Sequence, residues 1–226
     1  MIKGLTTVIV PAWNQTPVST HLTMACLANI TKYTDPYDYE LILTEDEPKH
    51  NVRDEYKVLK IDEHITYNTY TPLSIKVNRA VERANGEFIA IIQNDCFVWE
   101  GWLPKCRYYL EKDMADAIVP DQIPRDRQYI LDANNNTMDE GFDNGYRDAC
   151  MMYLRKESFE KAGGYNEKIL AVVEGDFYYR LMNAGQRLHT TNKVQVTHIT
   201  LATHYQDMDE FERKMNNDSK VEDRHI

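Results

Sequence analysis

Asp95, Glu174 and His198 are the side chains that most directly suggest chemistry in this chain. Carboxylates bind hard divalent cations through oxygen, and glutamate and histidine also move protons. Each of the three lies at or just beyond the end of an apolar run. These runs cover residues 88–92, 169–173 and 194–196. The pattern predicts that separate segments deliver the three side chains to one cleft, in an enzyme that works on a phosphorylated small molecule.

A fourth apolar run, residues 6–10, stops at Pro11, Ala12, Trp13 and Asn14. Buried strands that end at polar residues place side chains at the carboxyl edge of a sheet, and ligands bind at this edge in open α/β sheets. Phosphates at such an edge need positive charge. The net charge of −10 means that the chain itself supplies little of it, so a cation held by Asp95 is the expected source.

Each of these side chains also has a structural alternative. Asp95 taken alone is more typical of a residue that caps a turn or helix. Glu174 and Asp176 are acids of the kind that a helix dipole favours in a first turn. A lone histidine is more often structural than a ligand, and His189 and His204 compete with His198. The order of the four segments, more than any single residue, favours the functional reading.

Composition limits the class of protein. With 226 residues and 42% apolar residues, one compact α/β domain is the simplest expectation. No apolar run approaches the length of a membrane span and the start does not resemble a signal peptide, so we expect no membrane insertion. The four cysteines form no CxxC pair, which is typical of reduced thiols in a cytoplasmic protein. The acidic balance argues against a generally basic, nucleic-acid-binding surface.

The apolar patterns predict alternating strands and helices, and hence a mostly parallel central sheet with helices on both faces. The expected strands cover residues 6–10, 39–43, 56–59, 87–92, 117–119 and 150–154. The expected helices cover residues 18–31, 72–84, 102–111, 158–162 and 174–184. Residues 120–148 are polar and lack periodicity, which predicts a functional loop. We expect a single domain over residues 1–205, and a charged C-terminal helix or tail over residues 206–226.

These segments, in this order, resemble family 2 glycosyltransferases, which have the Rossmann-like GT-A fold and use nucleotide-sugar donors. The resemblance spans about residues 6–204. It implies that the loop of Pro11, Ala12, Trp13 and Asn14 meets the nucleotide base. Glu45 and Asp46 fall on the acidic positions after the second strand, where the family contacts the base. Asn78 fits the family's segment that leads from a helix into the central strand. The stretch from Gly163 to Glu167 fits the family's glycine-glycine-aromatic-acid stretch, which precedes the helix on the acceptor side.

The family's Asp-x-Asp metal motif reads Gln93-Asn94-Asp95 in this chain. The resemblance therefore implies that Asp95 alone holds Mn²⁺ or Mg²⁺ with the donor's diphosphate, that Gln93 and Asn94 line the donor site, and that His198 completes the metal shell. One carboxylate plus phosphate is a sufficient site for such an ion. The base motif reads Glu174-Gly175-Asp176, so either acid is a candidate general base.

The resulting hypothesis is an inverting, metal-dependent glycosyltransferase that moves a sugar from a nucleotide-sugar, with a UDP-sugar as the favoured donor, to an acceptor hydroxyl. The alternative is a nucleotide- or sugar-binding module of the same fold without transfer activity, because the first metal-motif acid is absent. The acceptor stays open between a glycan, a protein and a modified nucleic-acid base. Viral-type glycosylation of modified DNA bases would need a local basic groove near Arg125, Arg127 and Arg147.

Overall fold

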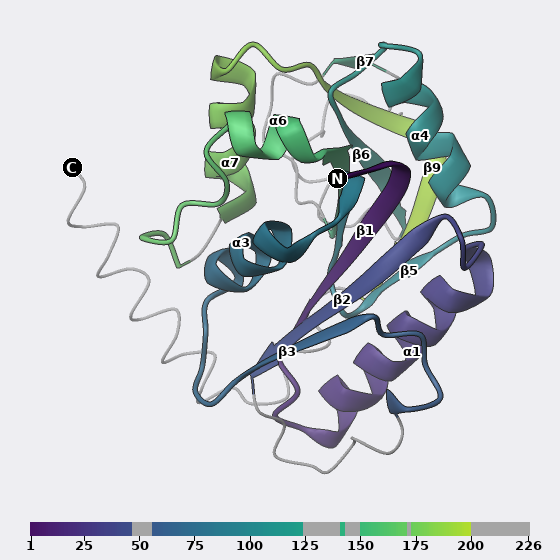
Figure 1. Cartoon of the computed structure of the whole chain (residues 1–226), viewed down its shortest axis with the longest axis vertical. Helices are drawn as coiled ribbons and strands as arrows, with labels where there is room; N and C mark the ends of the chain where they lie inside the picture. The colour runs from purple at the N-terminus through teal and green to yellow at the C-terminus, as the bar shows by residue number, and fades with distance from the viewer. Residues whose placement is uncertain (47–55, 124–140, 143–149, 171–172, 200–226) are drawn as a thin grey trace.

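The computed structural model describes residues 1–46, 56–123, 141–142, 150–170 and 173–199 (Figure 1). These residues form one curled sheet with helices on either side. The strands are β1 (Ile2–Ala12), β2 (Tyr39–Asp46), β3 (Glu63–Tyr67), β4 (Gly86–Ile92), β5 (Cys96–Val98), β6 (Ala117–Ile123), β7 (Gly141–Phe142), β8 (Met151–Arg155) and β9 (Leu188–His198).

The sheet has the strand order β3-β2-β1-β4-β8-β6-β9-β5, and β7 pairs with β9. The first four strands of this order are parallel, as are β6 and β9. In contrast, β8 is antiparallel to both of its neighbours, and β5 and β7 are antiparallel to β9. The sheet is therefore mixed rather than mostly parallel. Sequence periodicity misses this because a buried strand of either direction reads as an apolar run.

Helices cover both faces of the sheet, as predicted (Figure 1). One face packs against α1 (Pro17–Tyr33) and α4 (Trp102–Glu111), and the other against α3 (Leu73–Arg83), α6 (Lys156–Lys161) and α7 (Val173–Asn183). The side chains of successive residues in β1 alternate between the two cores, because strand side chains have a period of two. Val8 and Val10 join the α1 core, whereas Ile9 joins the α3 core.

Two local sequence features fix where elements begin. The start of α1 has a capping box between Thr16 and Ser19, with Pro17 in the first turn. At the start of β4, a Cβ on Gly86 would lie 2.6 Å from the backbone nitrogen of Thr7. Only glycine permits this close approach of the first residue of β4 to β1.

The structure corrects two predicted elements. Residues 56–59 are not a strand: Tyr56 is helical and a turn follows it, while the third strand lies at Glu63–Tyr67. A short run of aromatic and branched residues does not by itself distinguish a strand from a helical turn. Residues 120–123 of the predicted loop continue β6, with a register shift against β9 between Pro120 and Asp121. Such an irregularity is where a strand tolerates proline.

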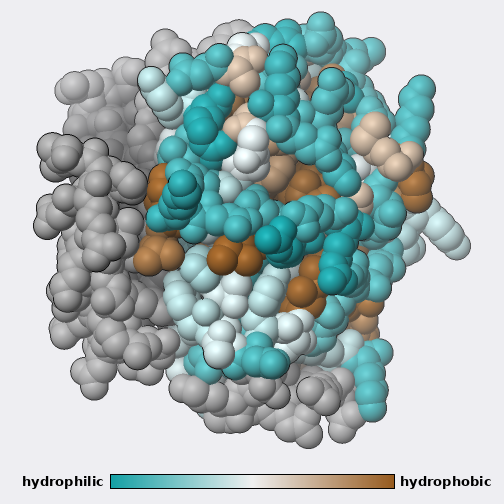
Figure 2. All heavy atoms as spheres, turned by 60° about the vertical axis from the view of Figure 1, so that its left-hand side comes forward, coloured by the Kyte–Doolittle hydropathy of each residue, from teal (hydrophilic) through white to brown (hydrophobic). Residues whose placement is uncertain are grey.

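Other predictions fall partly outside the described residues. Apart from β7, residues 124–148 of the predicted loop lie there, as do Arg125, Arg127 and Arg147. The proposed tail at residues 206–226 and His204 also lie outside, so the division at residue 205 stays a prediction. On the face turned forward in Figure 2, hydrophobic residues form small groups among hydrophilic ones. No helix in the part of the chain that the structure describes is both long and apolar enough to cross a membrane.

Candidate active site

Strand pairing brings Asp95 and His198 together. Asp95 lies in the turn between β4 and β5, and β5 pairs antiparallel with β9 so that Cys96 is opposite His198. The Nε2 atom of His198 lies 3.3 Å from Oδ1 of Asp95, and only 5% of each side chain is exposed. The backbone N–H of Ile199 also donates to the carbonyl oxygen of Asp95 at 3.0 Å. Two residues that the sequence proposed separately as metal ligands are therefore neighbours.

The Asp95 and His198 side chains offer one carboxylate and one imidazole, a donor set suited to Mn²⁺. Mg²⁺ prefers oxygen ligands throughout, so it fits less well. Among the described residues, no three histidine, cysteine, aspartate or glutamate side chains gather into a metal-binding group. A cation held here would therefore need further ligands from a bound molecule, and phosphate oxygens are of the right kind.

The loop that follows β1 is tied into the protein interior. Asn14 is fully buried, and its amide nitrogen donates to Glu45 and, at 2.9 Å, to the hydroxyl of Tyr56. Glu45 is also fully buried and accepts from Tyr56 at 3.1 Å, and its other oxygen lies 2.6 Å from Nε2 of His64. The side chains of Asn14 and Glu45 thus bind other protein groups. Pro11 and Ala12, which we expected in this loop, are instead the buried last residues of β1, and Trp13 is half-buried.

Asp46 forms a buried ion pair with Lys76 of α3. The ammonium lies 2.8 Å from Oδ2 of Asp46 and donates to the carbonyl oxygen of Ala12 at 2.8 Å. The other carboxylate oxygen of Asp46 accepts from the backbone N–H of Thr71 at 2.9 Å. Lysine is almost never fully buried unless it is paired. Lys76 therefore fastens α3 to the ends of β1 and β2, where the resemblance places the nucleotide base.

Sequence reasoning missed Lys76, Thr23, Tyr56 and His64 as members of this region. A signal for Lys76 was present, because it lies three residues after Leu73 and four before Ala80 on the inward stripe of its helix. No comparable signal marked Thr23 of α1, whose hydroxyl lies 2.7 Å from the amide oxygen of Asn14 and 2.9 Å from the amide nitrogen of Asn94. Tyr56 and His64 were obscured by the wrong position of the third strand.

Asn78 acts within the fold. Its amide nitrogen donates to the carbonyl oxygen of Tyr165 at 2.9 Å and to Glu167 at 3.0 Å, and its oxygen accepts from the backbone N–H of Tyr165 at 2.8 Å. Gly164 has φ +67°, and a Cβ there would lie 3.0 Å from the amide oxygen of Asn78. These contacts anchor the loop before α7 to α3, so the amide that we expected at the donor is already engaged.

The two candidate bases differ in their surroundings, although both lie in the first turn of α7. Asp176 forms an ion pair with Arg180 at 2.7 Å, and Arg180 also donates to the carbonyl oxygen of Ala162. Glu174 is half-buried and lies near Tyr165: burial raises the pKa of that phenol well above its usual value, and the negative charge of Glu174 adds to the rise. Asp176 therefore has a role in the helix, and Glu174 is the better candidate.

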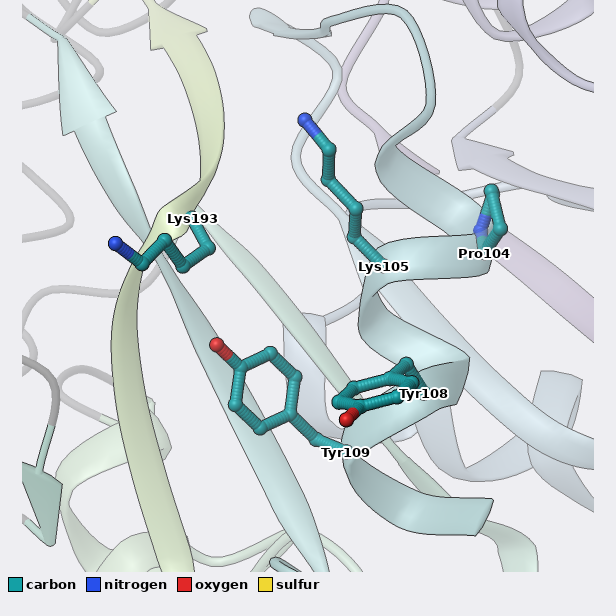
Figure 3. Close-up of a pocket in the computed structure, with 5 residues that line it drawn as sticks. All are labelled: Pro104, Lys105, Tyr108, Tyr109 and Lys193. Atoms are coloured by element: carbon teal, nitrogen blue, oxygen red, sulfur yellow. The ribbon is translucent and has the colours of Figure 1, made fainter. Parts of the chain in front are cut away.

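Other parts of β9 are separate from this site. His189 lies at the start of the strand with its ring centroid 5.1 Å from that of Tyr109, so it packs in the interior. A cavity of about 510 Å³ lies between α4 and β9, lined by Pro104, Lys105, Tyr108, Tyr109 and Lys193 (Figure 3). None of the residues proposed for the donor site lines this cavity.

The sequence model of glycosyl transferase family 2 matches residues 7–165 of the chain. The chain belongs to glycosyl transferase family 2. No curated protein sequence matches this family 2 glycosyltransferase.

Solved structures with the same fold include glycosyltransferases that bind UDP or a UDP-sugar. GalNAc-T7, crystallised with UDP, GalNAc and Mn²⁺, has a TM-score of 0.69 at 15% identity over 86% of this chain and 43% of its own. Residues 1–349 of S. aureus TarS in complex with UDP-GlcNAc give a TM-score of 0.66 at 13% identity, over 96% of this chain and 66% of that one. The chain thus spans less than half of GalNAc-T7 and about two thirds of the TarS fragment. These likenesses confirm the predicted GT-A fold.

Proposed function

We propose that this family 2 glycosyltransferase transfers a sugar from a UDP-sugar to an acceptor hydroxyl, with inversion at the anomeric carbon and with the help of a divalent cation. The observation that carries the proposal is the contact between Asp95 and His198 at the edge of the sheet. Two solved structures of the same fold contain UDP or UDP-GlcNAc, which supports the choice of donor.

Asp95 and His198 are the residues that would hold the cation. A bound divalent cation neutralises the negative charge that develops on the leaving diphosphate. Lys76 does not serve this purpose, because its ammonium is already paired with Asp46. In a chain with a net charge of −10, an added cation is the simplest source of the missing positive charge.

Glu174 is proposed as the general base. Its carboxylate accepts the proton of the acceptor hydroxyl, and the oxygen forms a bond to the anomeric carbon while the bond from that carbon to the UDP oxygen breaks. Because the oxygen enters on the face opposite the leaving UDP, the configuration inverts. Asp176 is less suited to this role because Arg180 already neutralises it.

For the acceptor we propose a glycan or a protein ahead of a modified nucleic-acid base, because the acidic balance of the chain disfavours an extended nucleic-acid surface. A cytoplasmic location is also proposed. The four cysteines are free and buried, which is consistent with a reducing compartment.

Isothermal titration of UDP with and without Mn²⁺, followed by an assay for UDP released from UDP-sugars, tests the proposal. We expect Mn²⁺-dependent binding of UDP and its release in the presence of an acceptor. Binding of UDP without turnover on any glycan or protein acceptor would favour the alternative, a binding module without transfer activity. The argument for this alternative is that Gln93 replaces the first acid of the metal motif. Failure of UDP to bind in the presence of Mn²⁺ would overturn the proposal.

A further inference from the structure

Thr23, in the middle of α1, connects two strand ends that are proposed to form the donor site. Its hydroxyl donates to the amide oxygen of Asn14 at 2.7 Å. The same hydroxyl accepts from the amide nitrogen of Asn94 at 2.9 Å. Thr23 and Asn14 are fully buried and Asn94 is 7% exposed, so these bonds form away from water. Asn14 belongs to the loop after β1, and Asn94 immediately precedes Asp95.

The hydrogen bonds run from Glu45 through Asn14 and Thr23 to Asn94, and the direction of each one fixes the direction of the next. The amide of Asn14 turns its nitrogen toward Glu45 and the hydroxyl of Tyr56, so its oxygen faces Thr23 and can only accept. The hydroxyl of Thr23 must then donate to Asn14, or to the carbonyl oxygen of Ser19, which lies 3.0 Å away. Both groups are acceptors, so the oxygen of Thr23 is left to accept from Asn94. Reversing one bond would leave a buried polar group without a partner.

We propose that Thr23 is a positioning residue that couples the nucleotide loop to the strand end that carries Asp95. The inference rests on the proposed function and adds to it a role for a buried residue of α1. A cation that fixes Asp95 also restrains the adjacent Asn94, and through Thr23 it restrains Asn14 and its loop. The binding of UDP and the binding of Mn²⁺ therefore strengthen each other in part through this hydroxyl, as reciprocal linkage requires.

Thr23→Val tests the coupling, because it keeps the branched shape and removes the hydroxyl. The measurement is the affinity for UDP by isothermal titration, with and without Mn²⁺. In the wild type, Mn²⁺ strengthens UDP binding by some factor, and we expect Thr23→Val to reduce that factor by roughly tenfold, since two buried hydrogen bonds are lost. Thr23→Ser restores the hydroxyl and should restore the factor.

Thr20→Val is the matched control. Thr20 lies on the same helix and is also buried. Its hydroxyl donates to the carbonyl oxygen of Thr16, four residues earlier, at 3.0 Å, and the hydroxyl of Thr23 makes the equivalent contact with the carbonyl oxygen of Ser19. It has no contact with Asn14 or Asn94 among its hydrogen bonds, so its replacement should leave the effect of Mn²⁺ unchanged. If Thr23→Val does not fold, as judged by its melting curve, Thr23→Ala and Thr20→Ala replace the pair of valine variants.

The outcomes separate the inference from the proposed function. Wild-type protein that does not bind UDP in the presence of Mn²⁺ would overturn both. Wild-type binding together with an unchanged effect of Mn²⁺ in the Thr23 variants would overturn the inference alone. An equal loss of UDP affinity with and without Mn²⁺ would also overturn it, because it would show that Thr23 only supports the loop.

Discussion

At the scale of single residues, the carboxylates proposed for the site differ in the group that they face. Asp46 faces the ammonium of Lys76, and Asp176 faces the guanidinium of Arg180. Both are neutralised within the protein. Asp95 instead faces an imidazole, which binds a metal as a neutral ligand. The imidazole can therefore bind the same cation as the negative charge of Asp95.

Replacing Asp95 by alanine removes that charge. We expect Asp95→Ala to lower sugar transfer at least 100-fold and to abolish the effect of Mn²⁺ on UDP binding, because Asp95 is the proposed carboxylate ligand. Transfer rates and UDP titrations check both effects. Gln93→Asp is the companion variant: it should retain activity or bind Mn²⁺ more tightly. An active Asp95→Ala enzyme would refute the metal assignment.

The general base is tested by a pair of amide variants. Glu174→Gln keeps the size of the side chain but removes its ability to accept a proton, so transfer should fall by roughly 10²–10⁴ while UDP affinity survives. Asp176→Asn loses an ion pair with Arg180, and we expect mainly a small loss of stability, about 1 kcal/mol or less. Rates, UDP affinity and urea unfolding of both variants are the measurements. An active Glu174→Gln enzyme beside an inactive Asp176→Asn enzyme would move the role to Asp176.

At the scale of elements, the Asp46–Lys76 pair fixes a helix to two strands. Lys76→Met leaves the Asp46 carboxylate buried without its cation, so the free energy of unfolding should fall by roughly 3–5 kcal/mol at neutral pH. Urea unfolding measures this. The exposed pair of Arg79 and Glu82 on the same helix provides the control, and Arg79→Met should change stability by less than about 1 kcal/mol. An equal loss in the free energy of unfolding for the two variants would show that burial does not make the Asp46–Lys76 pair more important than the exposed one.

The sequence predicted elements better than it predicted contacts between them. The predicted helix at 102–111 has the bounds of α4, because the spacing of apolar residues along a helix is a local property. The sequence indicated that Asp95 and His198 share a role as metal ligands, but it did not predict their contact. That contact depends on the pairing of β5 with β9. The partners of Glu45, Asp46 and Asn78 were not predictable, because each depends on a residue brought close by the fold. The direction of β8 escaped prediction for the same reason.

At the scale of the whole molecule, ligand binding should raise the thermal stability of the chain. A ligand at 100 times its dissociation constant stabilises the folded state by about 2.7 kcal/mol if it does not bind the unfolded chain. For a protein of this size, that corresponds to a rise in Tm of roughly 5–10 °C. We expect UDP with Mn²⁺ to produce this shift in a melting curve, and a chelator to reduce it. ADP with Mn²⁺ is the control for recognition of the nucleotide base. An equal rise in Tm with ADP would argue against selectivity for uridine.

The strand order also bears on how the protein is made. A ribosome releases the N-terminal part of a chain first, so β1, β2, β3 and β4 can pair with one another early in synthesis. Asp95 emerges directly after them, but the histidine that faces it belongs to β9, the last described strand. A nascent chain thus acquires its nucleotide-side strands well before its proposed cation site is complete. On the proposed function, the pair of Asp95 and His198 can therefore hold a cation only after β9 has been translated.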